Sequence, residues 1–426
     1  MAELNRRFIR INMFELITSL TNAADLVRPE LANHHKQVAY LSYRIAEQLN
    51  HSNDDFRNLL LAGLMHDVGA LSFDSQLELI ENETPSFNDH AFRGARLLEN
   101  YEPLRQVAGI IRYHHLPWGH GSGMTFQGKP VSIFSHILHL ADRVAVSIDP
   151  KTEILSQVKK IFETVKKGEG SIYHPELILA LEALSKKEYV WLDLVSNNLL
   201  ELISNFVSFD TVHMNLDETM NLTKIFASII DYRSPFTANH TAGVANTAKK
   251  LAELVGFCEN ECKMMQIAGH LHDLGKLAVS KEVLEKPSNL DVDEFNSIRS
   301  HTFYTYRLLQ PIKGFEVINQ WASFHHEKLD GSGYPFHLTA EEIPLGSRIM
   351  AVADIFTAIT EDRPYRRGMT RQQAIEVLNK MVTDKAICPK IVALLVENYD
   401  LLNETRKKAQ LLASMEYNYF ATHDID

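Results

Sequence analysis

The 426-residue sequence predicts an all-α protein made of two similar helical domains in tandem. Apolar residues recur at helical spacing: Val244, Leu251, Leu254 and Val255 fall on one helix face, as do Ile355 and Ile359, and then Ile375, Val377, Leu378 and Met381. Long runs in which apolar and polar residues alternate, as they do in a strand, are scarce, so strands should be few. Marker residues of the first half also recur, in the same order, in the second half, which indicates an internal duplication.

The duplication is visible in two ungapped pairs of segments. Ala32-Asn33-His34 recurs as Ala238-Asn239-His240, and AGLMHDVG at 62–69 recurs as AGHLHDLG at 268–275, both offset by 206 positions. Further on, His90 matches His301 and His114-His115 matches His325-His326, at an offset of 211, and Asp142 matches Asp354 at 212. Two small insertions in the second copy explain why the offset increases from 206 to 211 and then to 212. An apolar helix is expected over 189–203, and we place the boundary after it, with domains of residues 1–207 and 208–426.

Composition restricts the classes of function. With 45% apolar and 23% charged residues the chain has a globular composition, and its net charge of −11 argues against binding DNA. No apolar run is long enough for a membrane helix, and residues 1–7 lack the apolar core of a signal peptide. Cys258, Cys262 and Cys388 form no paired zinc motif. We therefore expect a soluble cytoplasmic protein with structural cysteines and no membrane insertion. The sequence has no sustained heptad repeat of apolar residues, so it does not indicate an oligomeric state.

The C-terminal half contains a set of histidines and aspartates suited to metal binding, namely His240, His272, Asp273, His301, His325, His326 and Asp354. Imidazole and carboxylate groups are ligands of first-row metals such as iron, manganese or zinc. Seven groups exceed the needs of one ion. Two ions bridged by Asp273 would use them all, with His240, His272 and Asp354 on one ion and His301, His325 and His326 on the other. Two ions about 3.5–4 Å apart can clamp a phosphoryl group for in-line displacement.

A single histidine on an apolar helix face is more often a hydrogen-bonded core residue than a metal ligand. The duplication favours the metal interpretation, because both halves retain these residue types at nearly matching intervals while most intervening residues differ. The sequence therefore predicts a metal centre.

Three segments of the C-terminal half carry a family resemblance: HDLGK at 272–276, HHEKLDGSGYP at 325–335 and RPYR at 363–366. In these segments the chain resembles the HD-GYP phosphodiesterases, a branch of the HD superfamily. Members of that family, including tandem bacterial ones, hydrolyse cyclic di-GMP or cyclic GMP-AMP. The resemblance implies two HD-type domains and opening of a cyclic dinucleotide to a linear one. It also implies two divalent first-row metal ions in the C-terminal site, iron or manganese rather than zinc.

The resemblance also assigns roles to individual residues. Asp273 and Lys276 would be catalytic, and the residues that bind substrate would be Lys276, Tyr334, Arg363 and Arg366. These side chains suit the task, since lysine and arginine provide cations for phosphate and tyrosine provides a stacking surface with a polar tip. The alternative interpretations are a solvated helix-end charge for Lys276, a turn aromatic for Tyr334 and a surface cluster for the arginines; the position of Lys276 three residues after Asp273 favours a role at the metal centre.

The N-terminal copy keeps metal ligands but not the substrate motifs. Family members with a third metal have a glutamate four residues before the first ligand histidine; that position is Phe236 in the C-terminal copy and Glu30 in the N-terminal one. A second metal cluster could therefore form from Glu30, His34, His66, Asp67, His90, His114, His115 and Asp142, with His35 as a bystander. Ala70 replaces the lysine, and GHGSGMT at 119–125 replaces the GYP loop. We expect this copy to be degenerate and to serve packing or regulation.

Two other functions remain open at this point. The chain could be an HD-type hydrolase of another nucleotide, against which the GYP loop and the RPYR segment argue. It could also be a non-catalytic module that senses a cyclic dinucleotide, which fits the N-terminal half better than the C-terminal half. Neither the choice between cyclic GMP-AMP and cyclic di-GMP nor the native metal can be derived from the sequence.

Overall fold

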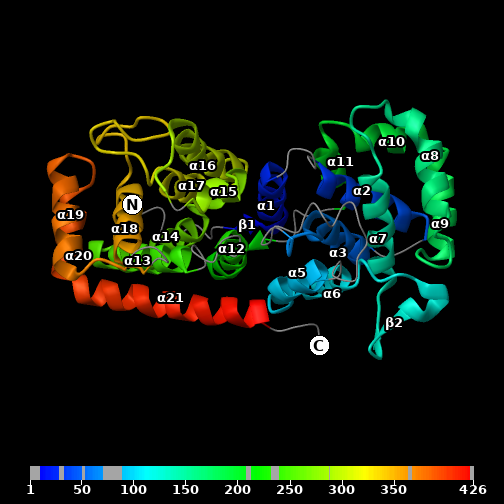
Figure 1. Cartoon of the computed structure of the whole chain (residues 1–426), viewed down its shortest axis with the longest axis horizontal. Coiled ribbons are helices and arrows are strands. Elements are labelled where there is room, and N and C mark those ends of the chain that lie inside the picture. The colour runs from blue at the N-terminus through cyan, green and yellow to red at the C-terminus, as the bar shows by residue number, and fades with distance from the viewer. Residues whose placement is uncertain are drawn as a thin grey trace. The chain divides into compact units, whose positions relative to one another are not determined.

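The computed structural model describes residues 10–27, 33–49, 53–70, 89–207, 213–231, 239–286, 288–362 and 367–422. These residues form two compact units (Figure 1). The C-terminal unit contains residues 10–27 together with 213–422, and the N-terminal unit contains residues 33–207. Helices provide most of the regular structure and the strands are two-residue segments throughout the described ranges, which confirms the all-α prediction.

The N-terminal unit is a helical bundle in which α2 packs against α3 and α7, and α5 packs against α6. Its helices are α2 (His34–Glu47), α3 (Asn53–Met65), α5 (Asp89–Glu99), α6 (Arg105–Arg112), α7 (Ile133–Val146), α8 (Ile154–Lys166), α9 (Pro175–Ser185), α10 (Glu188–Leu194) and α11 (Leu199–Phe206). The described residues of the unit also form two short 3-10 helices, η4 (Glu102–Leu104) and η5 (Gly119–Met124), and one hairpin, β2 (Thr125–Phe126) with β3 (Lys129–Pro130).

The helix expected over 189–203 is interrupted, so the prediction of one continuous helix was wrong. Residues 195–198 separate α10 from α11, and the Ser196 side chain donates a hydrogen bond to the Asp193 carbonyl at 2.7 Å. Serine and asparagine side chains compete with helical backbone bonds in this way. The run Ser196-Asn197-Asn198 therefore breaks the helix despite its apolar flanks.

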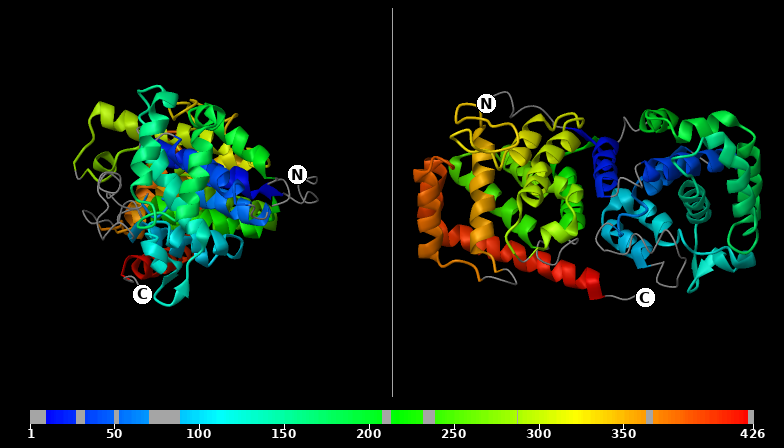
Figure 2. Two further views of the ribbon diagram at one scale, coloured as in Figure 1. Left: turned by 90° about the vertical axis from the view of Figure 1, so that its right-hand side faces the viewer. Right: turned by 45° about the horizontal axis from the view of Figure 1, so that its top comes forward.

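The C-terminal unit is built around α13, which packs against α14, α18 and α21. Its helices are α1 (Met13–Val27), α12 (Leu216–Asp231), α13 (His240–Val255), α14 (Glu259–Leu271), η6 (Leu274–Ala278), α15 (Lys281–Leu284), α16 (Val292–Leu309), α17 (Glu316–Ser323), α18 (Leu345–Thr360), α19 (Arg371–Thr383), α20 (Pro389–Glu397) and α21 (Tyr399–Thr422). The antiparallel strands β1 (Ile11–Asn12) and β4 (His213–Met214) pair within this unit. The long helix α21 lies along the bundle on the α13 side in both figures (Figures 1 and 2).

The duplication extends to the way the helices pack. A Cβ atom added to Gly63 of α3 would lie 2.4 Å from the Ala39 Cα of α2, and a Cβ added to Gly269 of α14 would lie 2.5 Å from the Ala245 Cα of α13. Real atoms cannot approach so closely, so glycine at both positions allows the two helices to touch backbone to backbone. This contact holds the first ligand histidine of each copy beside its His-Asp pair.

Helix α1 lies in the sequence range predicted for the first domain but packs in the C-terminal unit, against η6 and α16. Its side chains Leu16 and Ile17 are fully buried, and the Ser19 hydroxyl donates a hydrogen bond to the Leu308 carbonyl at 2.9 Å. Burial of this apolar face accounts for the placement. The boundary near residue 208 remains a prediction. No helix in the described ranges has both the length and the apolar character needed to cross a membrane.

Candidate metal centre

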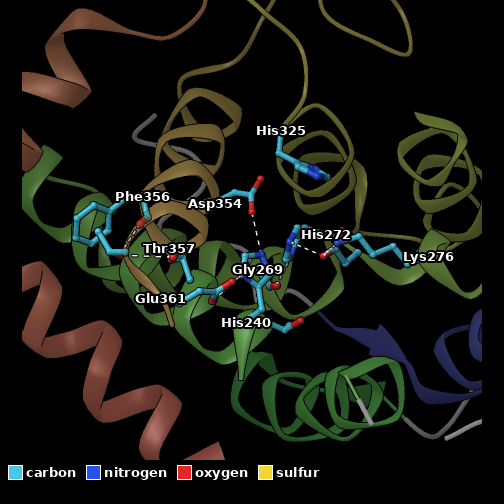
Figure 3. Close-up of polar contacts among 12 residues, drawn as sticks. His240, Gly269, His272, Lys276, His325, Asp354, Phe356, Thr357 and Glu361 are labelled. Atoms are coloured by element: carbon cyan, nitrogen blue, oxygen red, sulfur yellow. Dashed lines mark hydrogen bonds and ion pairs between the residues drawn. The ribbon is translucent and has the colours of Figure 1, made fainter. Parts of the chain in front are cut away.

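The C-terminal unit brings its seven predicted ligands together from five helices. His240 begins α13, His272 and Asp273 follow α14 directly, His301 lies in α16, His325 and His326 follow α17, and Asp354 lies in α18. Six of these side chains are buried, and His326 is half-buried. His240, His272, His325 and Asp354 point toward a common centre (Figure 3).

Asp273 lies between two groups of histidines. Its Oδ2 is 3.1 Å from the His272 Nε2, and its Oδ1 is 3.4 Å from the His301 Nε2. The possible ligand atoms of His240, His272 and Asp273 lie within 4.8 Å of one another, as do those of His301, His325 and His326. The Asp354 Oδ1 is 3.0 Å from the His240 Nε2. The structure thus gathers the predicted ligands around Asp273, and their division between two ions stays a prediction.

Backbone carbonyls orient the histidine rings for metal binding. The Nδ1 atoms of His272, His301 and His325 lie 2.8, 2.6 and 2.6 Å from the carbonyls of Gly269, Ile298 and Ala322, each three residues earlier. A carbonyl accepts only, so the proton is assigned to Nδ1 and the lone pair of Nε2 faces the centre. Within the described part of the chain, the buried His272 Nε2 has no hydrogen bond. The donor set fits a divalent first-row metal.

Burial sets the charge of the His301 and His325 rings, whereas at His272 burial is outweighed by the Asp273 carboxylate, which raises the pKa of that ring. Burial lowers the pKa of His301 to about 3 and holds the pKa of His325 well below its usual value, so both are neutral at pH 7. His240 differs, because burial lowers its pKa but the carboxylates of Glu361 and Asp354 outweigh that effect and raise it to about 10. His240 therefore carries a proton in the metal-free protein, and a metal ion must displace it.

Two of the predicted substrate residues lie beside the centre. The Lys276 Nζ is 2.5 Å from the Asp273 Oδ2. The Tyr334 ring stacks on the His326 ring, with centroids 5.0 Å apart, and the Arg299 guanidinium lies 5.0 Å from the Tyr334 ring centroid. Arg299 was not singled out from the sequence. Arg363 and Arg366 lie outside the described residues, so their roles stay predictions.

The N-terminal unit repeats the arrangement. Asp67 places Oδ2 3.3 Å from the His66 Nε2 and Oδ1 3.2 Å from the His90 Nε2, and the Asp142 Oδ1 is 3.2 Å from the His34 Nε2. The Nε2 atoms of His90 and His115 are 3.1 Å apart, and His114 completes the group. His35, the expected bystander, is also buried, with its ring centroid 5.3 Å from that of His66. Glu30 lies outside the described residues.

The substrate side of the N-terminal unit differs from that of the C-terminal unit. Ala70, at the position of Lys276, is buried and offers no charge. The sequence comparison also missed Glu361, whose carboxylate faces the Nδ1 of His240 at 3.1–3.2 Å. The matching residue of the N-terminal copy is Asp149, so a search for shared ligands did not reveal it.

Two helical bundles, each with a buried His-Asp centre, define a tandem HD-domain protein. The family model described as HD domain matches residues 31–147, and a second HD-domain model matches residues 224–391. The 3'3'-cGAMP-specific phosphodiesterase 1 of Vibrio cholerae is 30% identical over 397 residues, which cover 91% of this chain and 92% of the relative. Phosphodiesterase 3 of the same organism is 26% identical, with 91% and 95% covered. The chain therefore belongs to the HD-domain family of cyclic dinucleotide phosphodiesterases.

More distant similarities agree with the fold and the family. A cyclic di-GMP phosphodiesterase of Thermotoga maritima is 33% identical over 180 residues, which cover 41% of this chain and 48% of the relative. Among solved structures, a cyclic GMP-AMP-specific phosphodiesterase of Vibrio cholerae (V-cGAP3) has a TM-score of 0.65 and 22% identity, covering 92% of this chain and 98% of that one. The latter similarity shows the tandem all-α fold.

Proposed function

We propose that the chain is a metal-dependent phosphodiesterase that opens a cyclic dinucleotide to a linear dinucleotide at its C-terminal centre. The observation that carries this proposal is the position of Asp273, between the two histidine groups and 2.5 Å from the Lys276 ammonium. The relatives support the substrate class, since they are phosphodiesterases of 3'3'-cGAMP or of cyclic di-GMP.

Two divalent ions, iron or manganese rather than zinc, would be held in this centre. Asp273 would be shared, with His240, His272 and Asp354 on one ion and His301, His325 and His326 on the other. When bound, such ions supply Lewis acidity toward a phosphodiester and a strong nucleophile at neutral pH. Burial and the contacts of their Nδ1 atoms with backbone carbonyls would hold the His272, His301 and His325 rings in orientation before binding.

The residues around the centre would bind and polarise the substrate. Lys276 would stabilise the negative charge that grows on the phosphoryl oxygens, which is the dominant contribution in many such reactions. Tyr334, held by its stacking on His326, would present a flat surface to a purine. Arg363 and Arg366 would contact phosphate or a base edge. These groups together would select a doubly charged ligand with two bases.

The N-terminal centre would hold metal without turning over substrate. Its histidines and Asp67 repeat the ligand geometry, but Ala70 provides no cation for a phosphate. This unit would therefore act in regulation or stability.

Metal analysis and product identification test the proposal. Purified protein, an Asp273→Ala variant and a His66→Ala/Asp67→Ala variant are incubated with cyclic GMP-AMP and cyclic di-GMP in competition, and products are separated by chromatography. The Asp273→Ala variant should lose turnover, and the variant of the N-terminal centre should retain it. Full turnover by Asp273→Ala would contradict the assignment of the site, and complete loss in a folded His66→Ala/Asp67→Ala variant would contradict the division of roles.

A further inference from the structure

A buried carboxylate lies behind the first metal ligand of the C-terminal centre. Glu361 follows the last residue of α18 and is 6% exposed. Its Oε1 and Oε2 lie 3.2 and 3.1 Å from the His240 Nδ1, while the Asp354 Oδ1 faces the other ring nitrogen at 3.0 Å (Figure 3). A carboxylate on the far nitrogen of a ligand histidine fixes the ring orientation and increases the basicity of the near nitrogen.

Helix α21 holds this carboxylate in place. The Gln410 side-chain amide donates a hydrogen bond to the Glu361 Oε2 at 3.0 Å. The Gln410 oxygen in turn accepts a hydrogen bond from the guanidinium of Arg406, which is 3% exposed and one helical turn earlier. Both ends of the Gln410 amide are therefore bonded, so its orientation is fixed. The buried charge of Glu361 has partners on two sides, as a buried ion requires.

Glycine at position 243 makes room for this contact. Gly243 lies one turn after His240 on α13, and a Cβ added there would lie 3.0 Å from the Gln410 Nε2, 3.1 Å from the Gln410 Cγ and 2.9 Å from the Thr357 Cγ2. These distances are shorter than ordinary van der Waals contact. Because residue 243 has no side chain, Gln410 can pass α13 and reach Glu361.

In the described part of the N-terminal copy, two of these positions carry different residues with different contacts. The position that matches Gly243 is Gln37, whose side-chain amide donates to the Leu194 carbonyl at 3.0 Å. The position that matches Glu361 is Asp149, which accepts hydrogen bonds from the Lys151 backbone and the Thr152 hydroxyl at 2.9 and 2.7 Å. The residues at positions 37 and 149 therefore make contacts of their own, which differ from those of Gly243 and Glu361.

We propose that Glu361 is a positioning residue for the metal ligand His240, and that α21 braces it through Gln410. The proposal rests on the metal centre proposed above, and it gives the C-terminal helix α21 a role in holding that centre in position. Glu361 lies against the ring nitrogen of His240 opposite the one that faces Asp354, and acts by presenting His240 to the ion in a single orientation. Loss of the carboxylate therefore lowers the affinity for the ion held by His240. It leaves the affinity for the ion held by His301, His325 and His326 unchanged.

The test measures metal affinity in a chain whose N-terminal centre is disabled by His66→Ala and Asp67→Ala. Chelator-stripped protein is titrated with Mn²⁺ by calorimetry, and the bound metal is counted. Glu361→Gln keeps the size of the side chain and should weaken one of two Mn²⁺ sites about 10- to 100-fold, the usual cost of losing such a partner. Glu361→Asp should restore part of the affinity. Gln410→Ala should weaken the same site by a smaller factor.

A control and a second readout separate positioning from general structural damage. Glu342→Gln removes an exposed carboxylate that accepts hydrogen bonds from Thr339, and it should leave both sites unchanged. Turnover by Glu361→Gln should recover as Mn²⁺ is raised, which a misfolded site would not do. Wild-type affinity in Glu361→Gln, or an equal loss in Glu342→Gln, would overturn the inference. If the parent chain with an intact Glu361 bound no Mn²⁺, the proposed metal centre itself would fail.

Discussion

A matched pair of glycine substitutions tests which centre catalyses the reaction. Gly275 lies directly before Lys276, and an added Cβ would be 2.0 Å from the His301 carbonyl oxygen and 2.8 Å from the Thr305 nitrogen. In the N-terminal copy, a Cβ on Gly69 would be 2.2 Å from the His90 carbonyl oxygen. Each glycine therefore allows the segment after the His-Asp pair to lie against the helix that carries the next ligand.

The size of the effect follows from these distances. Ordinary contact begins at 3.4 Å, so Gly275→Ala must push the backbone at His301 away by about 1.4 Å. The neighbouring contacts resist this movement, because the Thr305 hydroxyl links the Gly275 nitrogen to the His272 carbonyl at 2.9 and 3.1 Å. Overpacking of this kind costs about 1–3 kcal/mol of stability. A displacement of about 1 Å at a reacting centre can cost 10²-fold in rate, so turnover should fall at least that far.

The assay compares turnover, bound metal and thermal unfolding in both variants. Gly69→Ala should lower the unfolding temperature to a similar degree and reduce metal at the N-terminal centre, yet keep most of the turnover. Gly275→Ala should lose turnover together with metal at the C-terminal centre. A folded Gly275→Ala variant with wild-type turnover would refute the packing argument. An equal loss of turnover in Gly69→Ala, with C-terminal metal unchanged, would refute the assignment of catalysis to one centre.

Two further predictions concern charge at the C-terminal centre. Lys276→Met keeps the length of the side chain but removes its cation, so kcat should fall about 10²–10³-fold. Elemental analysis should show that both metals are retained. A parallel loss of metal would instead assign Lys276 a structural role. The pKa of His240 is raised from 6.5 to about 10, so Mn²⁺ must displace one proton from this side chain when it binds. The apparent affinity of the C-terminal centre for Mn²⁺ should therefore rise about tenfold per pH unit between pH 7 and 9. A flat pH profile in calorimetric titrations would contradict this prediction.

The sequence was sufficient to predict the features that the two copies share. Helical spacing at 244–255, 355–359 and 375–381 falls within α13, α18 and α19, and the ordered recurrence of histidines and aspartates identified the residues that the structure gathers at each centre. Comparison of the copies could do this because ligand chemistry restricts those positions to few residue types, whereas packing tolerates many.

Other features depend on the tertiary path of the chain. The placement of α1 in the C-terminal unit is determined by burial against η6 and α16, which no local pattern specifies. Glu361, Gln410 and Gly243 meet because α21 packs against α13. The first copy has Asp149 and Gln37 at the positions of Glu361 and Gly243, so a search for residues shared by the copies did not reveal the contact. The break at 195–198 was visible in principle, since Ser-Asn-Asn disfavours a helix interior.

The placement of one cation in each unit gives a physical reason, independent of family resemblance, for the different roles that we propose. In the N-terminal unit the Arg143 guanidinium bonds the Asp142 Oδ2 through Nε and Nη2 at 3.1 and 2.9 Å. In the C-terminal unit the residue after Asp354 is Ile355, and the cation is Lys276, beside the shared Asp273. A guanidinium held by two bonds neutralises its own carboxylate, whereas a single flexible ammonium can turn from Asp273 to an arriving phosphate. On the proposed function, the N-terminal centre would therefore offer ligands to a metal, and the C-terminal centre would also offer a positive charge to a substrate.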